Sequence, residues 1–397
     1  MRLPSRTRVG VVGAGPAGLL LAALLRRAGV DCVVLESRER SYVERRQRAG
    51  VLEQSTVDAL RGCGAAERLD REGLAHDGIE LRWNRRAQRI DFPSLTGGRR
   101  VWVYAQTEVV KDLIAHDLTA GVPLAFGTPA LAVTGADTDR PVVTYRHEGR
   151  EQSLACDYVV GCDGFHGVVR TAVPASARTT YERRYPYSWL GVLADVPPSC
   201  DELIYAHSPR GFALHSLRSP TVSRLYLQVA NGTDPADWSD ERIWDELDAR
   251  FAVEGDWRLR RGPLTQKSVL PMRGSVTEPM RHGSVFLAGD AAHIVPPTGA
   301  KGLNLAAGDV IELGRAFALR YADGTDRALA AYSDTRLRRI WRAQHFSYSL
   351  TTMLHTDPGD PDPGFGVRLQ LARLDRIAAS RAARAELAEN YVGPATR

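Results

Sequence analysis

Cysteine is scarce in this sequence, and its cysteines do not stand in the close spacing of a metal or redox motif. The cysteines among the 397 residues are Cys32, Cys63, Cys156, Cys162 and Cys200. They are scattered and odd in number, which argues against a disulfide framework and against a zinc site. We therefore expect free thiols in a reducing cytosol and no bound metal.

Neither sign of charge dominates the chain. Its 52 Lys and Arg residues stand against 47 Asp and Glu residues, a formal net charge of +5 at pH 7. So small an excess does not indicate a nucleic-acid partner, although it suits a protein that attracts small anions. Hydrophobic residues make up 44% and charged residues 25%, which excludes a disordered or collagen-like chain. A chain of this length can bury a large core without disulfides.

Long apolar runs are also rare. The run from Val9 to Leu25 contains several glycines and Pro16, and it is shorter than the ~20 residues that a membrane helix needs. We interpret it as a buried strand followed by a helix, rather than as a signal peptide or a membrane span. Because no other long apolar segment is present, we expect a cytoplasmic protein with no membrane partner.

The first 40 residues predict a βαβ unit. Residues 8–13 are typical of a buried strand, residues 17–28 of a helix and residues 32–36 of the next strand. Sheets built from such units are usually parallel. The chain therefore begins with an α/β layer.

The pattern changes further along the chain. Residues 183–272 alternate apolar and polar side chains between turn signals, which predicts an antiparallel sheet, with a helix over 240–253. After Gly302 the pattern becomes helical. Helices are expected over 304–323, 326–355 and 366–389.

The segment after the first strand has the spacing of a dinucleotide-binding turn. Gly13-Ala14-Gly15-Pro16-Ala17-Gly18 is G-x-G-x-x-G, placed between a strand and a helix. Its glycines allow a pyrophosphate to approach the backbone, and the helix start offers N–H groups and a positive dipole. Glu36, at the end of the next strand, would accept hydrogen bonds from ribose hydroxyls.

Two later motifs favour FAD over NAD as the bound dinucleotide. Asp163-Gly164 follows an apolar strand, and Asp290 follows another strand in the run Phe286–His293. An acidic side chain there can bond the ribityl chain of FAD. The helix that follows can face the flavin edge where negative charge gathers on reduction.

With these motifs in place, the chain resembles the single-component FAD-dependent aromatic hydroxylases, the group A flavoprotein monooxygenases. The similarity covers nearly the whole chain, and the last two supporting runs are specific to one branch of the family. The runs are Arg48–Gln54, Gln106–Glu108, Gly161–Gly167, Leu203–Tyr205, Pro209–Ala213, Trp238–Arg242, Leu287–Leu305 and Ala388–Gly393.

The resemblance implies a set of residues that line the FAD. Together with the fingerprint positions they are Gly13, Gly15, Ala17, Gly18, Glu36, Arg46, Gln47, Arg48, Ala49, Gly50, Val51, Gln106, Asp163, Asp290, Leu303 and Asn304. It also implies that Arg224 helps to govern the position of the flavin.

The resemblance further implies a phenol-binding site with a proton relay. Tyr205 would contact the substrate phenol and Tyr391 would contact Tyr205, with His76 at the outer end of the relay. Pro297 would offer a backbone carbonyl near the phenol, with Thr298 close by. Because a histidine titrates near neutrality, His76 could pass the proton to water.

The same resemblance implies that Ser216, Arg218 and Tyr226 hold the substrate carboxylate, with Leu217 between the first two. The residues agree with this, because Ser216 and Arg218 share a face of a strand and an arginine fork suits a carboxylate. A hydrogen bond from Tyr205 would favour a substrate phenolate and lower its pKa.

The nicotinamide coenzyme has no second fingerprint in this sequence, so it is expected to bind transiently in a surface groove. Candidate contacts are Arg38, Tyr42, Arg48, His166 and Arg273. The segment 37–42 differs from the NADPH-preferring pattern of the family, which leaves NADH and NADPH both open.

Three positions depart from the family pattern. His215 replaces a cysteine, Leu217 replaces an amide side chain, and Ala17 replaces a serine at the phosphate turn. These departures put the ring substituents of the substrate in question more than the chemistry.

The implied activity is hydroxylation of 4-hydroxybenzoate ortho to its phenol, with NAD(P)H and O2, through a C4a-hydroperoxide of FAD, to give 3,4-dihydroxybenzoate. His215 motivates an alternative substrate, a substituted 4-hydroxybenzoate such as an amino derivative. A rival of another class is a flavin-binding sensor or carrier without hydroxylase activity. Such a protein would not need Ser216, Arg218 and Tyr226.

The predicted fold class is α/β, and the chain as a whole is α+β. A Rossmann-like FAD-binding domain with a parallel sheet covers 1–75, 100–182 and 273–304. An antiparallel substrate domain covers 76–99 and 183–272, and a C-terminal helical region covers 305–397. FAD is expected to be non-covalent, because the sequence has no evident attachment motif. The family leads us to expect a homodimer.

Overall fold

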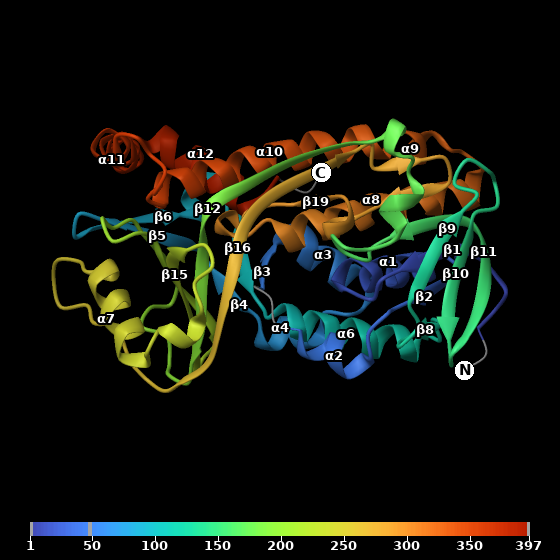
Figure 1. Ribbon diagram of the computed structural model, residues 1–397, viewed down its shortest axis with the longest axis horizontal. Coiled ribbons are helices and arrows are strands. Elements are labelled where there is room, and N and C mark those ends of the chain that lie inside the picture. Colours follow the sequence, from blue (N-terminus) through green and yellow to red (C-terminus); the bar gives the residue numbers. More distant parts are fainter. Residues whose placement is uncertain (1–2, 47–49, 395–397) are drawn as a thin grey trace.

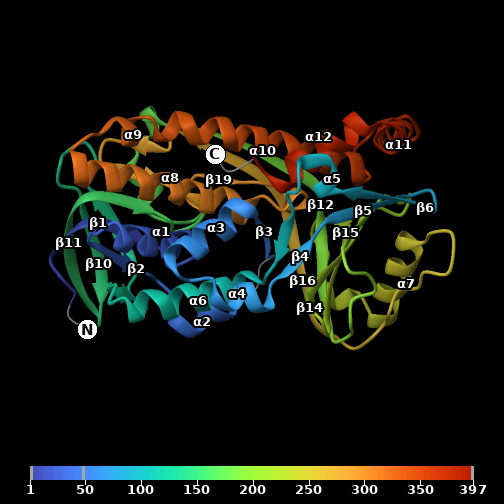
Figure 2. The same ribbon diagram turned by 180° about the vertical axis from the view of Figure 1, so that it is seen from behind.

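The computed structural model describes residues 3–46 and 50–394. Two large sheets lie at opposite ends of an elongated molecule, and the helices α8 (Gly302–Asp323) and α10 (Tyr332–Leu354) run along one side between them (Figures 1 and 2). Within the described ranges, no helix is both long and apolar enough to cross a membrane.

The first sheet is largely parallel. Its strand order is β17-β18-β11-β1-β2-β8, and the pairs β18/β11, β11/β1, β1/β2 and β2/β8 are parallel. Strands β9 and β10 extend it in antiparallel fashion. The bounds are β1 Arg6–Val12, β2 Cys32–Leu35, β8 Leu124–Ala125, β9 Ala130–Thr134, β10 Val142–His147, β11 Arg150–Gly161, β17 Arg281–His282 and β18 Val285–Leu287.

The apolar composition of these strands explains their central position. Val9, Val11 and every residue of β2 are buried, as continuous apolar strands are when helices cover both faces of a parallel sheet. The helix α1 (Pro16–Arg27) packs against α6 (Gln106–Thr119) and α8. The predicted βαβ unit is therefore present as β1, α1 and β2, and the α/β fold class is confirmed.

The second sheet has the order β19-β16-β12-β15-β14-β13-β5-β6. All of its pairs are antiparallel except β13/β5, which is parallel. The sequence analysis predicted only antiparallel pairing; β5 differs because it enters the sheet from the separate 76–99 segment. The bounds are β5 Gly78–Trp83, β6 Arg86–Asp91, β12 Thr179–Ala194, β13 Leu203–Ala206, β14 Ala213–Ser219, β15 Val222–Ala230, β16 Leu264–Glu278 and β19 His293–Ile294.

One face of this second sheet is covered by α7 (Asp240–Phe251), the helix predicted over 240–253. Ser239 begins it by accepting the N–H of Arg242, as an N-cap serine does. A small third sheet, β3 (Val51–Glu53), β7 (Val101–Val103) and β4 (Leu74–His76), was not predicted.

The remaining short elements connect the sheets. They are α2 Arg40–Arg45, α3 Gln54–Cys63, α4 Glu67–Glu72, α5 Phe92–Thr96 and α9 Arg327–Ala330, with 3-10 turns at Val169–Ala172, Ala175–Ala177, Pro235–Asp237, Gly289–Ala291 and Pro297–Gly299.

The last predicted helix, 366–389, is two helices. α11 (Pro363–Ala379) ends at Ser380, whose backbone is extended, and α12 (Arg381–Val392) begins there. The hydroxyl of Ser380 accepts the N–H of Ala383 and so caps α12. The serine is the local signal for this break, because it satisfies one of the first free N–H groups of the new helix.

Replacing Ser380 with alanine is expected to lower the free energy of unfolding by about 1 kcal/mol, because the N-cap hydrogen bond of α12 is lost. The measurement is urea unfolding of the wild type and the variant. Ser153→Ala, at an exposed position of β11, is the matched control. A loss no larger than that of the control would contradict the capping role.

Candidate functional site

The parallel sheet brings the predicted FAD motifs to one edge. The turn 13–18 follows β1, Glu36 follows β2, Asp163 follows β11 and Asp290 follows β18. Because these four strands are parallel neighbours, the motifs meet at their carboxyl ends. That edge is where open α/β sheets bind ligands.

Close packing requires two of the three glycines of the first motif, Gly13 and Gly18. Gly13 has φ +104°, and a Cβ there would overlap the backbone of Cys162. A Cβ on Gly18 would overlap the carbonyl of Gly13, whereas the space at Gly15 is open. Among the described residues no side chain caps α1, so its first N–H groups are not taken up by a capping side chain. This arrangement fits the pyrophosphate of FAD.

Glu36 is held at the end of β2 by backbone groups. One carboxylate oxygen accepts the N–H of Ala14 at 2.7 Å, and the other accepts the N–H of Arg38 at 2.8 Å. The carboxylate therefore lies against the turn that would bind the pyrophosphate. Its bonding to a ribose stays a prediction.

The other two acidic residues of the motifs differ in their surroundings. The carboxylate of Asp163 accepts the N–H of Val169 at 3.0 Å, and burial raises the pKa of Asp163 to about 6. A Cβ on Gly167 would overlap this carboxylate, so the acid is turned into its own loop. Asp290 is exposed in the turn Gly289–Ala291 and is the better placed of the two to meet a ligand.

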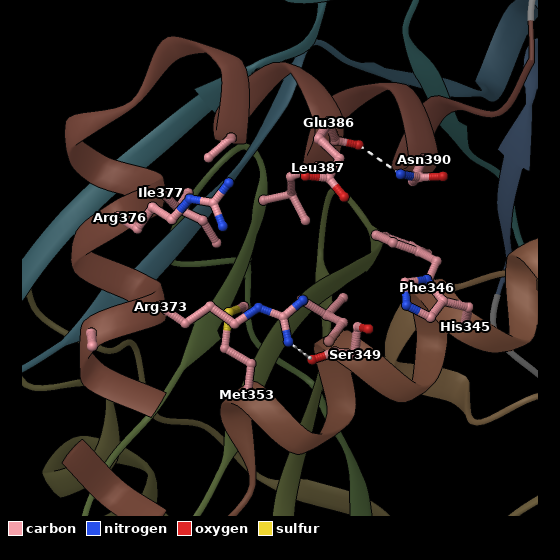
Figure 3. Close-up of a pocket in the computed structure, with 13 residues that line it drawn as sticks. His345, Phe346, Ser349, Met353, Arg373, Arg376, Ile377, Glu386, Leu387 and Asn390 are labelled. Atoms are coloured by element: carbon pink, nitrogen blue, oxygen red, sulfur yellow. Dashed lines mark hydrogen bonds between the residues drawn. The ribbon is translucent and has the colours of Figure 1, made fainter. Parts of the chain in front are cut away.

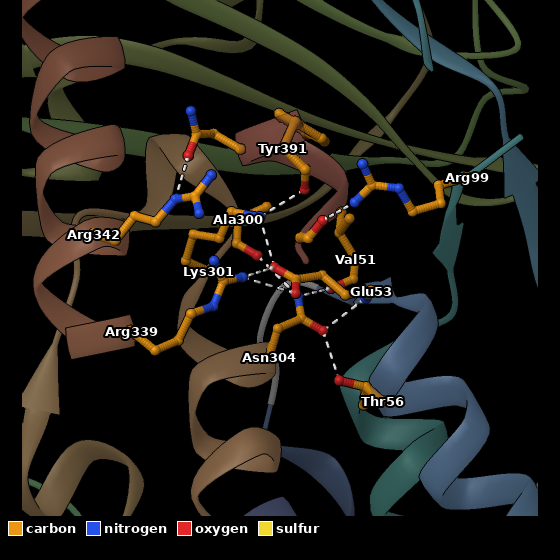
Figure 4. Close-up of polar contacts among 12 residues, drawn as sticks. Val51, Glu53, Thr56, Arg99, Ala300, Lys301, Asn304, Arg339, Arg342 and Tyr391 are labelled. Atoms are coloured by element: carbon orange, nitrogen blue, oxygen red, sulfur yellow. Dashed lines mark hydrogen bonds and ion pairs between the residues drawn. The ribbon is translucent and has the colours of Figure 1, made fainter. Parts of the chain in front are cut away.

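A buried ion-pair cluster lies at the start of α8 (Figure 4). The ammonium of Lys301, which is 1% exposed, lies 2.6 Å from Glu53 and donates to the carbonyl of Tyr391 at 2.6 Å. Arg339 from α10 reaches the other oxygen of Glu53 at 3.2 Å. Burial acts to raise the pKa of Glu53, but Lys301 and Arg339 outweigh it and hold the pKa below its ordinary value.

Asn304 belongs to the same cluster. Its side-chain oxygen accepts the N–H of Glu53 at 2.7 Å and the hydroxyl of Thr56 at 2.9 Å, and its amide donates to the carbonyls of Val51 and Ala300. The side chain is thus occupied in joining α8 to β3. The contact of Leu303 and Asn304 with FAD stays a prediction.

The sequence analysis missed Lys301, Glu53 and Arg339. One signal was available, since Lys301 is the only charged residue between Asp290 and Asp309. Its partners could not be inferred, because they lie far away along the chain.

Tyr205 and Tyr391 are far apart in the sequence but lie in the same buried cluster. Tyr205 lies on β13 and Tyr391 on α12, and their hydroxyl oxygens are 2.8 Å apart. Both side chains are about 1% exposed, and Tyr391 stacks on Phe92. Burial raises the pKa of both phenols, so both stay protonated at neutral pH and can donate hydrogen bonds.

The residues predicted to hold a carboxylate lie near these tyrosines. The strand register places Tyr205 opposite Leu214, Leu214 opposite Tyr226, and Ser216 opposite Arg224, so these side chains share one face. Ser216 donates to the carbonyl of Arg224 at 3.1 Å.

Arg218 reaches from this strand towards α6. It donates to the hydroxyl of Thr107 at 3.0 Å, beside Gln106 at the start of α6. Burial lowers the pKa of Arg218, and the nearby Arg224 adds to this effect. An anion at this position would relieve the repulsion between the two guanidinium groups.

His215 and Leu217 project from the opposite face of β14. The ring of His215 is fully buried, accepts the N–H of Ser199 at 3.1 Å and packs edge-on against Phe251 of α7. Strand alternation places Leu217 on the same side, so only its backbone can face the tyrosines. The expectation of a substituted substrate, which His215 motivated, therefore loses its basis, because the ring lies on the face away from the tyrosines.

His76 differs from its predicted surroundings. It is 1% exposed on β4, and burial lowers its pKa to about 4, below the near-neutral value that was assumed. Neither ring nitrogen has a hydrogen-bond partner among the described residues. The structure therefore does not link His76 to Tyr391, and its part in a relay stays a prediction.

The remaining predicted residues near the substrate lie in the turn before α8 and on β15. The carbonyl of Pro297 accepts the N–H of Ala300 at 2.9 Å, and buried Thr298 accepts the hydroxyl of Thr351 at 2.8 Å. The guanidinium of Arg224 lies 5.2 Å from the centre of the Tyr226 ring.

The predicted coenzyme contacts form two groups. Arg38 lies over the ring of Tyr42 at 5.2 Å, whereas Arg273 lies over Phe165 at 3.9 Å with exposed His166 beside it. Their binding of a nicotinamide coenzyme stays a prediction. Gln47, Arg48 and Ala49 fall outside the described residues.

A separate pocket of about 430 Å³ lies between α10, α11 and α12 (Figure 3). Arg373 and Arg376 of α11 border it, and Arg373 donates to the carbonyl of Ser349. The predicted site residues do not line this pocket. Its wall residue Phe346 also packs edge-on against Tyr391, which places the pocket behind the tyrosine pair.

Comparison with known proteins gives a consistent result. A family described as "FAD binding domain" matches residues 6–347. The chain is 46% identical to p-hydroxybenzoate hydroxylase of Acinetobacter baylyi over 98% of this chain and 95% of that protein. It is 29% identical to rifampicin monooxygenase of Streptomyces venezuelae, over 77% of this chain and 62% of that enzyme.

Solved structures share the fold. The crystal structure of p-nitrophenol 4-monooxygenase from Pseudomonas putida has a TM-score of 0.84 at 20% identity and covers 99% of this chain and 100% of its own. The crystal structure of aklavinone-11 hydroxylase in complex with FAD and aklavinone has a TM-score of 0.73 at 22% identity. It covers 91% of this chain and 73% of its own.

Lys301→Met is expected to lower the free energy of unfolding at pH 7 by about 3–5 kcal/mol, because it leaves the buried carboxylate of Glu53 with Arg339 alone. The double variant Glu53→Gln/Lys301→Met should lose less than Lys301→Met. Urea unfolding measures both, and a double variant at least as unstable as the single one would contradict the pairing.

The loss of stability caused by Lys301→Met should depend on pH. Because the pKa of Glu53 is lowered in the folded protein, its pairing contributes stability above the ordinary carboxyl pKa of about 4.3. This contribution disappears as the pH falls through the lowered folded value. The difference between wild type and Lys301→Met should therefore shrink on acidification, and a difference that grows would contradict this assignment.

Proposed function

Because this chain belongs to the family of FAD-dependent aromatic hydroxylases that includes p-hydroxybenzoate hydroxylase, we propose that its own substrate is 4-hydroxybenzoate, converted to 3,4-dihydroxybenzoate. The observation that carries this proposal is the contact between the hydroxyls of Tyr205 and Tyr391. It lies on the sheet face that also holds Ser216 and Tyr226. A donor for a phenolic oxygen and polar groups for a carboxylate thus share one face.

The carboxylate end of the substrate is assigned to Arg218, Ser216 and Tyr226. A guanidinium can bind a carboxylate through two parallel hydrogen bonds, which fixes orientation as well as position. Arg218 is partly buried and lies beside Arg224, so it would bind an anion more strongly than an exposed arginine would. These contacts would orient the ring with its phenol towards Tyr205.

The phenol end of the substrate is assigned to Tyr205. A buried tyrosine that stays protonated can donate a hydrogen bond to a phenolate oxygen, which favours the phenolate over the phenol. Tyr391 takes part by exchanging a hydrogen bond with Tyr205, which gives the substrate proton a path away from the ring. The ring carbon ortho to a phenolate oxygen is rich in electrons and attacks an electrophilic oxygen faster.

When bound and reduced, FAD supplies the activated oxygen that enters the ring. The residues of this chain orient the substrate, stabilise its phenolate and exclude water from the reacting carbon. NADH or NADPH is the proposed electron donor, with Arg38, Tyr42, Arg48, His166 and Arg273 as its proposed contacts.

Two further properties are proposals. A homodimer is supported by the family resemblance. A cytoplasmic location is supported by the thiols, since all five cysteines are free in the structure.

Identification of the product tests the proposed substrate. The purified protein is given 4-hydroxybenzoate and air with either NADH or NADPH, and the products are analysed by mass spectrometry. We expect a product heavier by one oxygen atom that matches 3,4-dihydroxybenzoate. Turnover of 3-amino-4-hydroxybenzoate in clear preference to 4-hydroxybenzoate would instead support the substituted substrate.

Arg218→Lys should weaken binding of 4-hydroxybenzoate by about 1.5–3 kcal/mol, roughly 10- to 150-fold, because lysine keeps the charge but cannot form the two-pronged contact. Binding is measured by titrating the FAD-loaded protein. 4-Hydroxybenzamide, which lacks the carboxylate, is the control ligand and should bind the two proteins almost equally. Equal binding of the acid would show that Arg218 does not hold it.

Tyr205→Phe separates binding from activation. Because Arg218, Ser216 and Tyr226 are unchanged, 4-hydroxybenzoate should still bind, but the pKa of the bound phenol should rise towards its solution value. Hydroxylation should slow, and oxygen should be released as hydrogen peroxide. The measurement is the ratio of hydroxylated product to NAD(P)H consumed, with peroxide assayed in parallel.

Tyr187→Phe is the matched control for this variant, because Tyr187 is a buried tyrosine of the same cluster on β12. We expect a large fall in the product ratio for Tyr205→Phe only. Unchanged coupling in Tyr205→Phe would show that Tyr205 is only a core residue.

A further inference from the structure

Asp309 is a buried carboxylate of α8 that the proposed reaction does not use. It is 0% exposed, and three groups converge on it. One oxygen accepts the backbone N–H of Gly289 at 2.9 Å and lies 2.6 Å from Nε2 of His293. The other oxygen accepts Nε of Arg336, from α10, at 2.7 Å. The carboxylate thus joins α8, α10, β19 and the turn Gly289–Ala291.

Gly289 is the residue immediately before Asp290, the exposed acid of the third FAD motif. Its φ of +59° lies in the left-handed region, which glycine adopts without the strain that a side chain would bring. A Cβ at Gly289 would lie 3.1 Å from the Cβ of Ala306 and 3.7 Å from that of Ala17. The turn is therefore packed between α8 and the start of α1, at the place where the first and third FAD motifs meet.

The charge of Asp309 is maintained in spite of its burial. Burial acts to raise the pKa of this acid, but His293 and Arg336 outweigh it, so the pKa lies below its ordinary value. A charged acceptor makes a stronger hydrogen bond to a backbone N–H than a neutral one does. The amide of Gly289 is consequently held more firmly than a serine or asparagine side chain could hold it.

We propose that Asp309 is a positioning residue for FAD, which fixes the amide of Gly289 so that Asp290 is presented to the ribityl chain. Arg336 and His293 keep the carboxylate charged and oriented. Asp309 itself touches neither substrate nor cofactor. The proposal depends only on FAD binding, so its test does not require the substrate assignment to be correct.

The first experiment measures the dissociation constant of FAD, from the flavin fluorescence released when the FAD-loaded protein is diluted. Asp309→Asn keeps the shape of the side chain but removes its charge and places an N–H₂ group among donors. We expect the dissociation constant to rise at least tenfold. An unchanged value would overturn the proposal.

Tyr332→Phe is the control for a general loss of stability. Tyr332 donates a buried hydrogen bond to the carbonyl of Leu287, on the strand that leads into the same turn, whereas the N–H of Gly289 donates to Asp309. It should lower the thermal midpoint of the protein while changing the dissociation constant of FAD less than twofold. If it weakens FAD as much as Asp309→Asn does, the effect of Asp309 is merely structural and the proposal fails.

The second experiment asks whether Asp309 acts through Asp290. Asp290→Asn alone should raise the dissociation constant of FAD. Adding Asp309→Asn to that variant should raise the constant less than twofold further, because a misplaced carboxylate and a missing one weaken FAD binding equally. Effects that multiply in the double variant would overturn the proposal. If Asp309→Asn does not fold, Arg336→Lys replaces it in the same set of variants. Arg336→Lys should then raise the dissociation constant of FAD at least fivefold. An unchanged dissociation constant would overturn the proposal.

Discussion

The buried ion pair between Lys301 and Glu53 joins the start of α8 to β3 and, through the carbonyl of Tyr391, to α12. Lys301 begins α8, which follows the third FAD motif, and its ammonium also binds the carbonyl of Tyr391. Removing two charges from water costs several kcal/mol each, so such a pair persists only with excellent geometry and further partners. Arg339 and the backbone of α12 supply those partners. The cofactor edge and the tyrosine pair are therefore fixed to one another by a few polar contacts.

The two sheets divide the chemistry between them. Parallel strands gather the FAD motifs at their carboxyl ends, whereas antiparallel pairing places Tyr205, Tyr226 and Ser216 on one face. The long strands β12 and β16 and the helices α8 and α10 extend between the two ends (Figure 1). Phe346 and Phe92 pack against the ring of Tyr391, which is 1% exposed. In such surroundings a single hydrogen bond shifts a phenol equilibrium more than it would in water.

The parts of the fold that sequence reasoning reached are those with local signals. The FAD-binding turn is one example, since the strand before it, the turn 13–18 and Glu36 lie within about 30 residues. Its chemistry depends on the backbone geometry, which the glycine positions indicate in the sequence. Resemblance supplied the pairing of Tyr205 with Tyr391, which spans 186 residues and has no local signal. The structure shows that contact, while the roles of its members stay predictions. The small sheet of β3, β7 and β4 was missed because strands of three residues leave almost no periodic pattern.

Burial was the quantity that the sequence could not provide. The sequence does not show that His76 is buried, yet its burial lowers its pKa to about 4. His215 looked like a substrate contact because it adjoins Ser216, but neighbours on a strand face opposite ways. The Lys301 cluster joins four segments of the chain, so only the folded arrangement identifies its members.

The contact between Lys301 and Tyr391 also bears on the order in which the protein can be completed. The two residues are 90 positions apart, so at about 5–20 residues per second roughly 5–18 s of translation separate their emergence. The parallel strands and their glycine turns are made before that interval, and can fold around dinucleotide while the ribosome is still working. Tyr391, the hydrogen-bond partner of Tyr205, is synthesised near the end of that interval. A nascent chain therefore completes the strands that carry the FAD motifs before it can form the contact between Tyr205 and Tyr391.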